Sequence, residues 1–238
     1  MPGLIIHAIE KGTNKALVAW AKEIVDKGFK TVNMLGCHDG IPLLDLKGKE
    51  VKGIFQKGLL EDEEIKETMS LILERGGRVK NLYGADGKKV SYNQMNATYY
   101  SALGEDDQKM LLASAIQLFM LGTPQIWYLD IFAGTNDYEA VENAGKDGHK
   151  EINRSNLSLE QISTGLEKEV VKGQLALIKP RNTSAAFGGT ILIQDSPKNE
   201  LNILWENTNE MAQLIANLET HAFRIDYMHE GQKKTMSF

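Results

Sequence analysis

The sequence predicts an α/β fold followed by a small antiparallel β domain. Helical patterns alternate with apolar, strand-like runs through most of the chain, which is typical of parallel α/β proteins. From Gly188 the pattern changes to short apolar runs separated by Pro, Asn, Glu and Gly, which favours several short strands. With 238 residues and 42% hydrophobic content, the chain can bury a large core.

The first predicted unit is a helix followed by a strand. Asn14 can cap a helix whose apolar residues recur at helical spacing as far as Val25, and Gly28 provides a stop. Residues 29–35 then have the composition of a strand. Their apolar content predicts a place inside a sheet that is covered on both faces.

Further helices and one more strand follow. Residues 46–58, rich in Lys and Gly, and the polar stretch after residue 77 are predicted to be loops. Residues 61–74 form a predicted helix with an acidic first turn, as the helix dipole favours. A largely buried helix is expected from Gly104 to Gly122, then a buried strand at residues 125–129, "QIWYL". A helix from 159 to 178, ended by a proline, completes the α/β part.

Composition excludes several classes of partner. The net charge is -5 and the sequence has no basic run, which argues against nucleic acid as a partner. No apolar segment approaches the roughly 20 residues needed to cross a bilayer, so no membrane association is expected. Cys37, the single cysteine, rules out an internal disulfide and a multi-cysteine zinc site. These features predict a cytoplasmic protein.

The stretch "NMLGCHDG", residues 33–40, ends the first predicted strand with a His38-Asp39 pair. The pair can be a turn aspartate beside a core histidine, part of a metal site, or the lip of a barrel active site. The other histidines show no metal-ligand spacing, so no metal is predicted. The strand directly before the pair favours the active site, because catalytic residues of barrels follow strands.

Two other polar residues are candidates for binding. Arg154 lies in a polar segment beyond the second strand, where it can anchor a ligand or make a surface ion pair. Gln94 lies just ahead of a buried helix, where an amide can contact a polyol or remain solvated.

Only two buried parallel strands are predicted, and a parallel sheet normally needs more strands to bury its faces. The pattern therefore indicates the end of a larger fold.

Four motifs occur in the order "NMLGCHDGIPLLDLKG", "YNQMNATYYSALGEDDQK", "TPQIWYLDIFAGTNDYEAV" and "GHKEINRSNLS". In this order they resemble the sucrose phosphorylase branch of the α-amylase superfamily of (β/α)8-barrel enzymes. The resemblance implies that residues 1–182 are the C-terminal portion of such a barrel, with strands seven and eight and their helices. Residues 183–238 would then be the small C-terminal β domain of the family.

The resemblance also implies a function. Enzymes of this branch are retaining hexosyltransferases that move a glucosyl group between an α-glucoside and inorganic phosphate, without an organic cofactor or metal. Asp39 would stabilise the transition state, His38 and Arg154 would bind the glucosyl group, and Gln94 would lie near the acceptor. The family's nucleophile and acid/base motifs are absent from this sequence, so the isolated chain is predicted to be inactive.

Two alternatives stay open at this point. Ser91 and Asn93 depart from the family pattern beside Gln94, so the substrate can be sucrose, sucrose 6-phosphate, glucosylglycerol or glucosylglycerate. The chain can also be a non-catalytic carbohydrate-binding or interaction module derived from such an enzyme. In either case, unpaired edges of the two barrel strands are expected to favour self-association.

Overall fold

The computed structural model describes residues 1–83 and 89–238, with the backbone alone at residues 80–83, 89–93, 146 and 147. Its α-helices are α1 (Pro2–Lys11), α2 (Lys15–Asp26), α3 (Asp62–Glu74), α4 (Tyr99–Ala102), α5 (Asp107–Phe119), α6 (Tyr128–Ile131), α7 (Tyr138–Ala144), α8 (Leu159–Gly165) and α9 (Glu169–Thr183). Short 3-10 helices are η1 (Leu44–Leu46), η2 (Gly145–Asn153) and η3 (Ala185–Gly188). The first six strands are β1 (Val32–Asn33), β2 (Lys49–Val51), β3 (Ile54–Gln56), β4 (Arg78–Tyr83), β5 (Lys89–Asn96) and β6 (Thr123–Pro124). The last five strands are β7 (Thr190–Ile193), β8 (Glu200–Asn207), β9 (Glu210–Asn217), β10 (Phe223–His229) and β11 (Gln232–Ser237).

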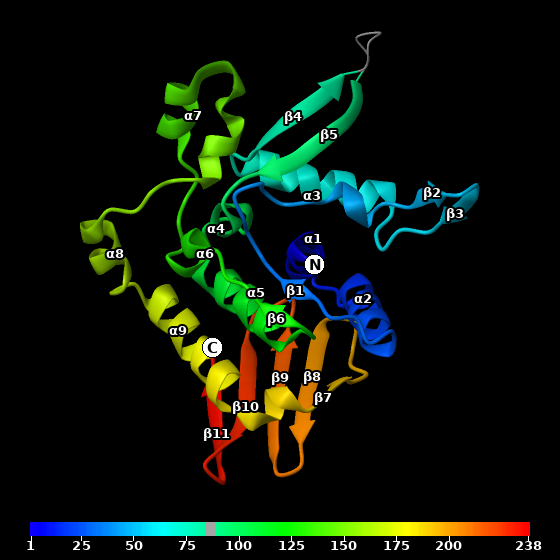
Figure 1. The fold of residues 1–238 in the computed structure, drawn as a ribbon, viewed down its shortest axis with the longest axis vertical. Coiled ribbons are helices and arrows are strands. Elements are labelled where there is room, and N and C mark those ends of the chain that lie inside the picture. Colours follow the sequence, from blue (N-terminus) through cyan, green and yellow to red (C-terminus); the bar gives the residue numbers. More distant parts are fainter. Residues whose placement is uncertain (84–88) are drawn as a thin grey trace.

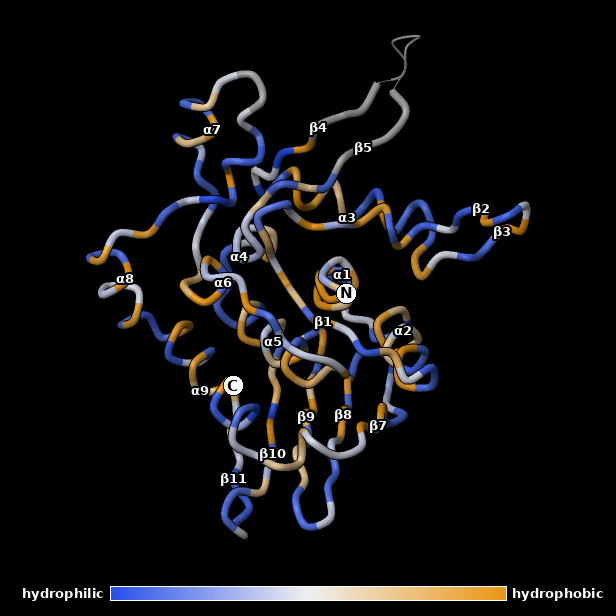
Figure 2. The backbone as a smooth tube through the Cα atoms, in the orientation of Figure 1, coloured by the Kyte–Doolittle hydropathy of each residue, from blue (hydrophilic) through white to orange (hydrophobic). Residues whose placement is uncertain are grey.

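Helices α1 and α5 contribute many residues to the hydrophobic core. Figure 2 shows hydrophobic residues in both helices. Helix α5 is buried along most of its length, as its apolar sequence predicts. Helix α1 packs against α2, α3 and α5, and the side chains of Leu4, Ile5 and Ile6 are fully buried. The apolar run at residues 2–11 is thus a core helix, begun by a proline in its first turn.

Strands β1 and β6 form a short parallel pair in which Val32 lies opposite Thr123 and Asn33 opposite Pro124. The predicted buried strand at 29–35 is therefore wrong in length and in burial, since Val32 is 62% exposed. Within the described residues β1 pairs with β6 alone, so no strand pairs with its other edge. Free edges of this kind favour association with another strand.

The second strand was expected at residues 125–129, but pairing occurs two residues earlier, at β6. The amide of Gln125 still donates to the carbonyl of Asn33, at 2.8 Å. Beyond this bond β1 offers no further paired residue, so the chain leaves the sheet and forms α6. The apolar run "QIWYL" is therefore mostly a loop and a helix start, not a strand.

The predicted helix at 159–178 is two helices, α8 and α9. Ser158 and Gln161 form a capping box that starts α8, and the extended backbone of Lys168 separates it from α9. Pro180 was expected to end the helix but lies inside α9. Its missing N–H leaves the carbonyl of Ala176 without a helical partner, and Ala176 is an exposed residue at which water can replace it.

Two predicted loops are hairpins that project from the body of the protein (Figure 1). Residues 46–58 contain the β2–β3 hairpin, whose turn residues Lys52 and Gly53 both have positive φ, as tight hairpins require. The polar stretch after residue 77 contains the β4–β5 hairpin. Both hairpins contain many polar residues, so hydrophobic periodicity did not predict them.

The C-terminal β domain is an antiparallel sheet with strand order β11-β10-β9-β8-β7, at the bottom of Figure 1. The prediction of antiparallel strands is confirmed. Strand β11 was not predicted, because its sequence "QKKTMS" is too polar, which suits an edge strand. Trp205 of β8 donates from Nε1 to the carbonyl of Phe119 at 2.8 Å and so joins the sheet to the end of α5.

No helix in the described part of the chain is both long and apolar enough to cross a bilayer.

Candidate active site at the end of strand β1

The chain leaves β1 and makes a tight turn that carries His38 and Asp39. The amide of Gly40 donates to the carbonyl of Cys37 at 3.2 Å, which closes the turn. Ile41 then exchanges two backbone hydrogen bonds with Met95 of β5, at 2.7 and 3.1 Å. The turn is thus fixed at both ends, while the His38 and Asp39 side chains remain 59% and 42% exposed.

Three nitrogen-bearing side chains surround the Asp39 carboxylate. His38 Nε2 lies 3.3 Å from Oδ2, Lys150 Nζ lies 3.4 Å from Oδ1, and Arg154 Nη2 lies 3.9 Å from Oδ1. A half-exposed carboxylate beside several N–H donors can accept hydrogen bonds from ligand hydroxyls while its neighbours donate to the same ligand. The site therefore suits a polyhydroxylated, sugar-like ligand.

Of the four residues predicted for the site, His38, Asp39 and Arg154 come together. Gln94 lies on β5, directly before the residue that pairs with Ile41, but its side chain makes no hydrogen bond to Asp39 or His38 among the described residues. The side chains of Ser91 and Asn93, which were considered with Gln94, lie outside those that the structure describes.

Lys150 was not selected from the sequence. It lies four residues before Arg154, within the last turns of η2, and both side chains reach the same carboxylate oxygen. Sequence spacing gave no signal for Lys150, because η2 is a 3-10 helix in which residues three apart, and not four, share a face.

Side chains from other segments also hold the backbone of the turn. Each of three consecutive carbonyls accepts one hydrogen bond from a side chain: Cys37 from Asn153 Nδ2 (2.6 Å), His38 from Arg154 Nε (3.0 Å) and Asp39 from Asn96 Nδ2 (3.1 Å). Asn96 and Asn153 are almost completely buried. Sequence patterns gave no sign of these contacts, which join residues far apart in the chain.

A buried carboxylate supports the turn from the other side. Asp130 of α6 accepts a hydrogen bond on Oδ2 from the amide of Gly36, at 2.7 Å, and is only 2% exposed. Burial raises the pKa of Asp130 to about 7, and the Gly36 hydrogen bond opposes that rise. A Cβ atom at position 36 would lie 2.6 Å from Asp130 Oδ1, so glycine is needed there.

Gly40 has a similar steric requirement, with φ +96 and a Cβ position that would lie 2.3 Å from the carbonyl oxygen of Met95. We expect Gly40→Ala to lower the free energy of unfolding by about 3 kcal/mol, because left-handed strain and a backbone clash add. Gly28→Ala is the matched control. Gly28 also has positive φ (+62) but no atom within 4 Å of the Cβ position, so strain alone should cost about 1 kcal/mol. Urea unfolding of the variants measures the difference, and equal losses would contradict the steric argument.

Trp127 contributes an aromatic surface next to the turn. Its ring centroid lies 6.1 Å from that of His38 and 4.6 Å from that of Tyr128. Neither aromatic residue was predicted from the sequence to belong to the site. The segment at the start of α6 therefore lies beside His38.

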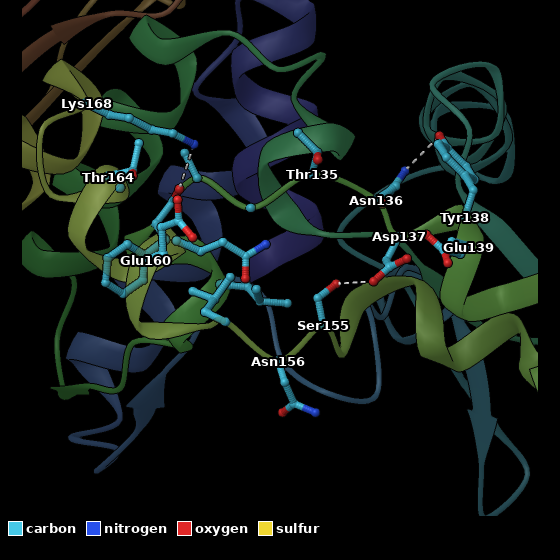
Figure 3. A pocket seen from close by; sticks show the side chains of 17 residues that line it. Thr135, Asn136, Asp137, Tyr138, Glu139, Ser155, Asn156, Glu160, Thr164 and Lys168 are labelled. Carbon is cyan, nitrogen blue, oxygen red and sulfur yellow. Dashed lines mark hydrogen bonds between the residues drawn. The ribbon is translucent and has the colours of Figure 1, made fainter. Parts of the chain in front are cut away.

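A cavity of about 700 Å³ lies nearby, between the segment after α6 and helix α8 (Figure 3). It contains none of the four predicted site residues. Two pairs of its polar groups bond to each other: Asp137 accepts from Ser155 Oγ at 2.9 Å, and Asn136 Nδ2 donates to the Tyr138 hydroxyl at 3.4 Å. The geometry therefore favours the open surface around Asp39 as the functional site.

No cluster of His, Cys, Asp or Glu within the described residues could hold a metal ion.

The chain matches no family model. It is 52% identical, over 237 residues, to sucrose 6(F)-phosphate phosphorylase of Ilumatobacter coccineus, an alignment that covers 100% of this chain and 45% of that protein. It is 35% identical, over 239 residues, to sucrose phosphorylase of Streptococcus mutans serotype c, covering 100% of this chain and 47% of that protein.

A solved structure gives the same result. The crystal structure of sucrose 6F-phosphate phosphorylase from Thermoanaerobacter thermosaccharolyticum superposes with a TM-score of 0.85 and 34% identity, covering 100% of this chain and 46% of that chain. The chain thus spans about half the length of the relatives it matches. The resemblance to sucrose phosphorylases inferred from the four motifs is confirmed: the chain belongs to the sucrose phosphorylase family and corresponds to the C-terminal part of its members.

Proposed function

We propose that this chain supplies the glucosyl-binding part of an α-glucoside phosphorylase. The observation that carries the proposal is the Asp39 carboxylate at the end of β1, with His38, Lys150 and Arg154 within 3.9 Å of its oxygens. The relatives support it, since they are named as phosphorylases of sucrose, sucrose phosphate, glucosylglycerol and glucosylglycerate.

The proposed reaction is a retaining double displacement. The glycosidic C–O bond of the α-glucoside breaks as an enzyme carboxylate bonds to the anomeric carbon, and the departing oxygen takes a proton from the acid/base. A phosphate oxygen then attacks the same carbon, displaces the carboxylate and gives glucose 1-phosphate. Neither the nucleophile motif nor the acid/base motif occurs in these 238 residues, so another part of a complete enzyme must supply both.

Asp39 acts in both steps by stabilising the transition state. Its carboxylate accepts hydrogen bonds from glucosyl hydroxyls, and these bonds tighten as the ring flattens and positive charge develops at the anomeric carbon. His38 donates to the same sugar, and Arg154 contacts its far side. Gln94, on β5, which pairs with Ile41 after the turn, contacts the acceptor.

For the acceptor we favour phosphorylated fructose. The 52% identical relative is named for sucrose 6(F)-phosphate, whereas the relative named for glucosylglycerol, from Marinobacter adhaerens, is 28% identical. Direct comparison of sucrose 6(F)-phosphate, sucrose and glucosylglycerol as substrates tests this preference.

A hybrid protein tests the function itself. Residues 1–238 replace the matched segment of the Ilumatobacter coccineus relative, and glucose 1-phosphate is measured with sucrose 6(F)-phosphate and phosphate. We expect turnover by the hybrid and none by the isolated chain. A folded hybrid without turnover would refute the proposed function, and turnover by the isolated chain would refute its dependence on other residues.

The second candidate is a non-catalytic carbohydrate-binding module. It is favoured by one observation, that His38, Asp39 and Arg154 come together in a chain without the nucleophile motif. Calorimetric titration of the isolated chain with glucose tests it. Binding that Asp39→Asn abolishes, together with an inactive hybrid, would favour the module.

A further inference from the structure

Two buried asparagines direct their amide groups at the turn that carries Asp39. Asn153, at the end of η2, donates to the carbonyl of Cys37 at 2.6 Å. Asn96, at the end of β5, donates to the carbonyl of Asp39 at 3.1 Å. Their side chains are 2% and 1% exposed. The two hydrogen bonds lie on either side of His38 and reach the turn from different segments of the chain.

The carbonyl groups of the turn do not need two buried asparagines as hydrogen-bond donors. His38 in the turn is exposed and Cys37 and Asp39 are half-buried, and the carbonyls of a surface turn are commonly hydrated by water without the help of buried side chains. The arrangement also carries a cost, because Oδ1 of Asn96 and Oδ1 of Asn153 are buried without a hydrogen-bond partner among the described protein atoms. Such an unpaired oxygen costs about 1–3 kcal/mol.

We propose that Asn96 and Asn153 are positioning residues for Asp39. By fixing the carbonyls before and after His38, they hold the Asp39 carboxylate where the glucosyl ring binds. A displacement of about 1 Å at a reacting centre can lower the rate 10²-fold. A turn that holds Asp39 rigidly would therefore preserve the rate of the reaction. The ligand in this inference rests on the proposed function, whereas the fixing of the turn does not.

The chemistry of the contact requires an amide. A carbonyl oxygen needs an N–H donor, which Asn provides and an ionised Asp does not. Replacing Asn153 by Ala removes the donor, and replacing it by Asp places a negative group 2.6 Å from the Cys37 carbonyl. The Asp variant should therefore displace the turn more than the Ala variant.

A double-mutant cycle in the hybrid protein is the first test. We expect Asn153→Ala to lower kcat by roughly 10- to 100-fold with little change in KM, as loss of a supporting contact does. On an Asp39→Asn background the same change should lower kcat by less than about 2-fold, because the group it positions is already removed. Independent, additive losses in kcat would overturn the proposal.

The control variant is Asn199→Ala, in which an exposed amide loses a 3.1 Å hydrogen bond to Glu219 in the β domain. It should leave kcat unchanged.

Hydrogen exchange in the isolated chain is the second test and does not depend on activity. The Gly40 amide bonds to the carbonyl that Asn153 holds, so we expect its exchange to be at least about 10-fold faster in Asn153→Ala, with α5 unaffected. Unchanged exchange at Gly40 would overturn the proposal even if the hybrid is active. Faster exchange with an inactive wild-type hybrid would support the positioning of the turn and refute only the proposed function.

Discussion

The Asp39→Asn variant of the hybrid protein is expected to lose about 10²- to 10³-fold in kcat while KM for the α-glucoside changes little. The amide keeps the size of the side chain but lacks the negative charge that opposes the positive charge of the oxocarbenium-like transition state. It also accepts fewer hydrogen bonds from the sugar hydroxyls. Initial rates of glucose 1-phosphate formation at varied substrate concentration measure both constants.

The stability of the protein should hardly change in Asp39→Asn. The carboxylate is 42% exposed and its partners Lys150 and Arg154 are 34% and 31% exposed, so their ion pairs are screened by water. Asp195→Asn is the matched control, since Asp195 is an exposed residue between β7 and β8 that pairs with Lys22 of α2 at 2.7 Å. That control should retain full activity. A kcat within about 3-fold of wild type for Asp39→Asn would exclude the assigned role of Asp39.

The second large effect concerns Asp130 and pH. Burial raises its pKa from 3.8 to about 7, so the folded protein holds a proton that the unfolded chain releases near pH 4. Between these values the native state binds more protons, and the stability contributed by this group therefore falls as pH rises. Above about pH 7 both states are ionised and the loss is complete.

Asp130→Asn isolates this contribution. The amide oxygen can still accept the Gly36 hydrogen bond, but the side chain no longer titrates. We expect the variant to gain about 3 kcal/mol relative to wild type between pH 5 and pH 7, at 1.36 kcal/mol for each pH unit. Urea unfolding of the isolated chain at several pH values measures the gain. Parallel pH profiles for wild type and variant would show that Asp130 does not titrate in this range.

Local sequence predicted several elements correctly. Helices α2, α3 and α5 followed from helical periodicity, which depends on residues within a few positions of each other. Asn14 lies at the N-cap of α2 as predicted, but its side chain makes no capping hydrogen bond and donates instead to the carbonyls of Pro197 and Glu200. The turn with His38 and Asp39 followed from an apolar run that ends at a Gly-bounded polar pair. The four motifs identified the family because their order along the chain is itself sequence information.

Strand length and the hairpins depended on tertiary pairing. Strand β1 stops after two residues because its only partner in the described structure, β6, is equally short. The sequence of residues 29–35 alone could not predict that the strand has only two residues. The β4–β5 hairpin is stabilised by cross-strand pairing, so its polar sequence resembled a loop.

The sequence by itself determined the family, the order of the main helices and the identity of the central carboxylate, Asp39. Only the tertiary structure decided which side chains surround and hold that carboxylate. Asp130, Asn96 and Asn153 reach the turn across 94, 57 and 116 residues of chain, respectively. Periodicity and propensity act over a few residues, whereas hydrogen bonds of this range exist only after the chain has folded.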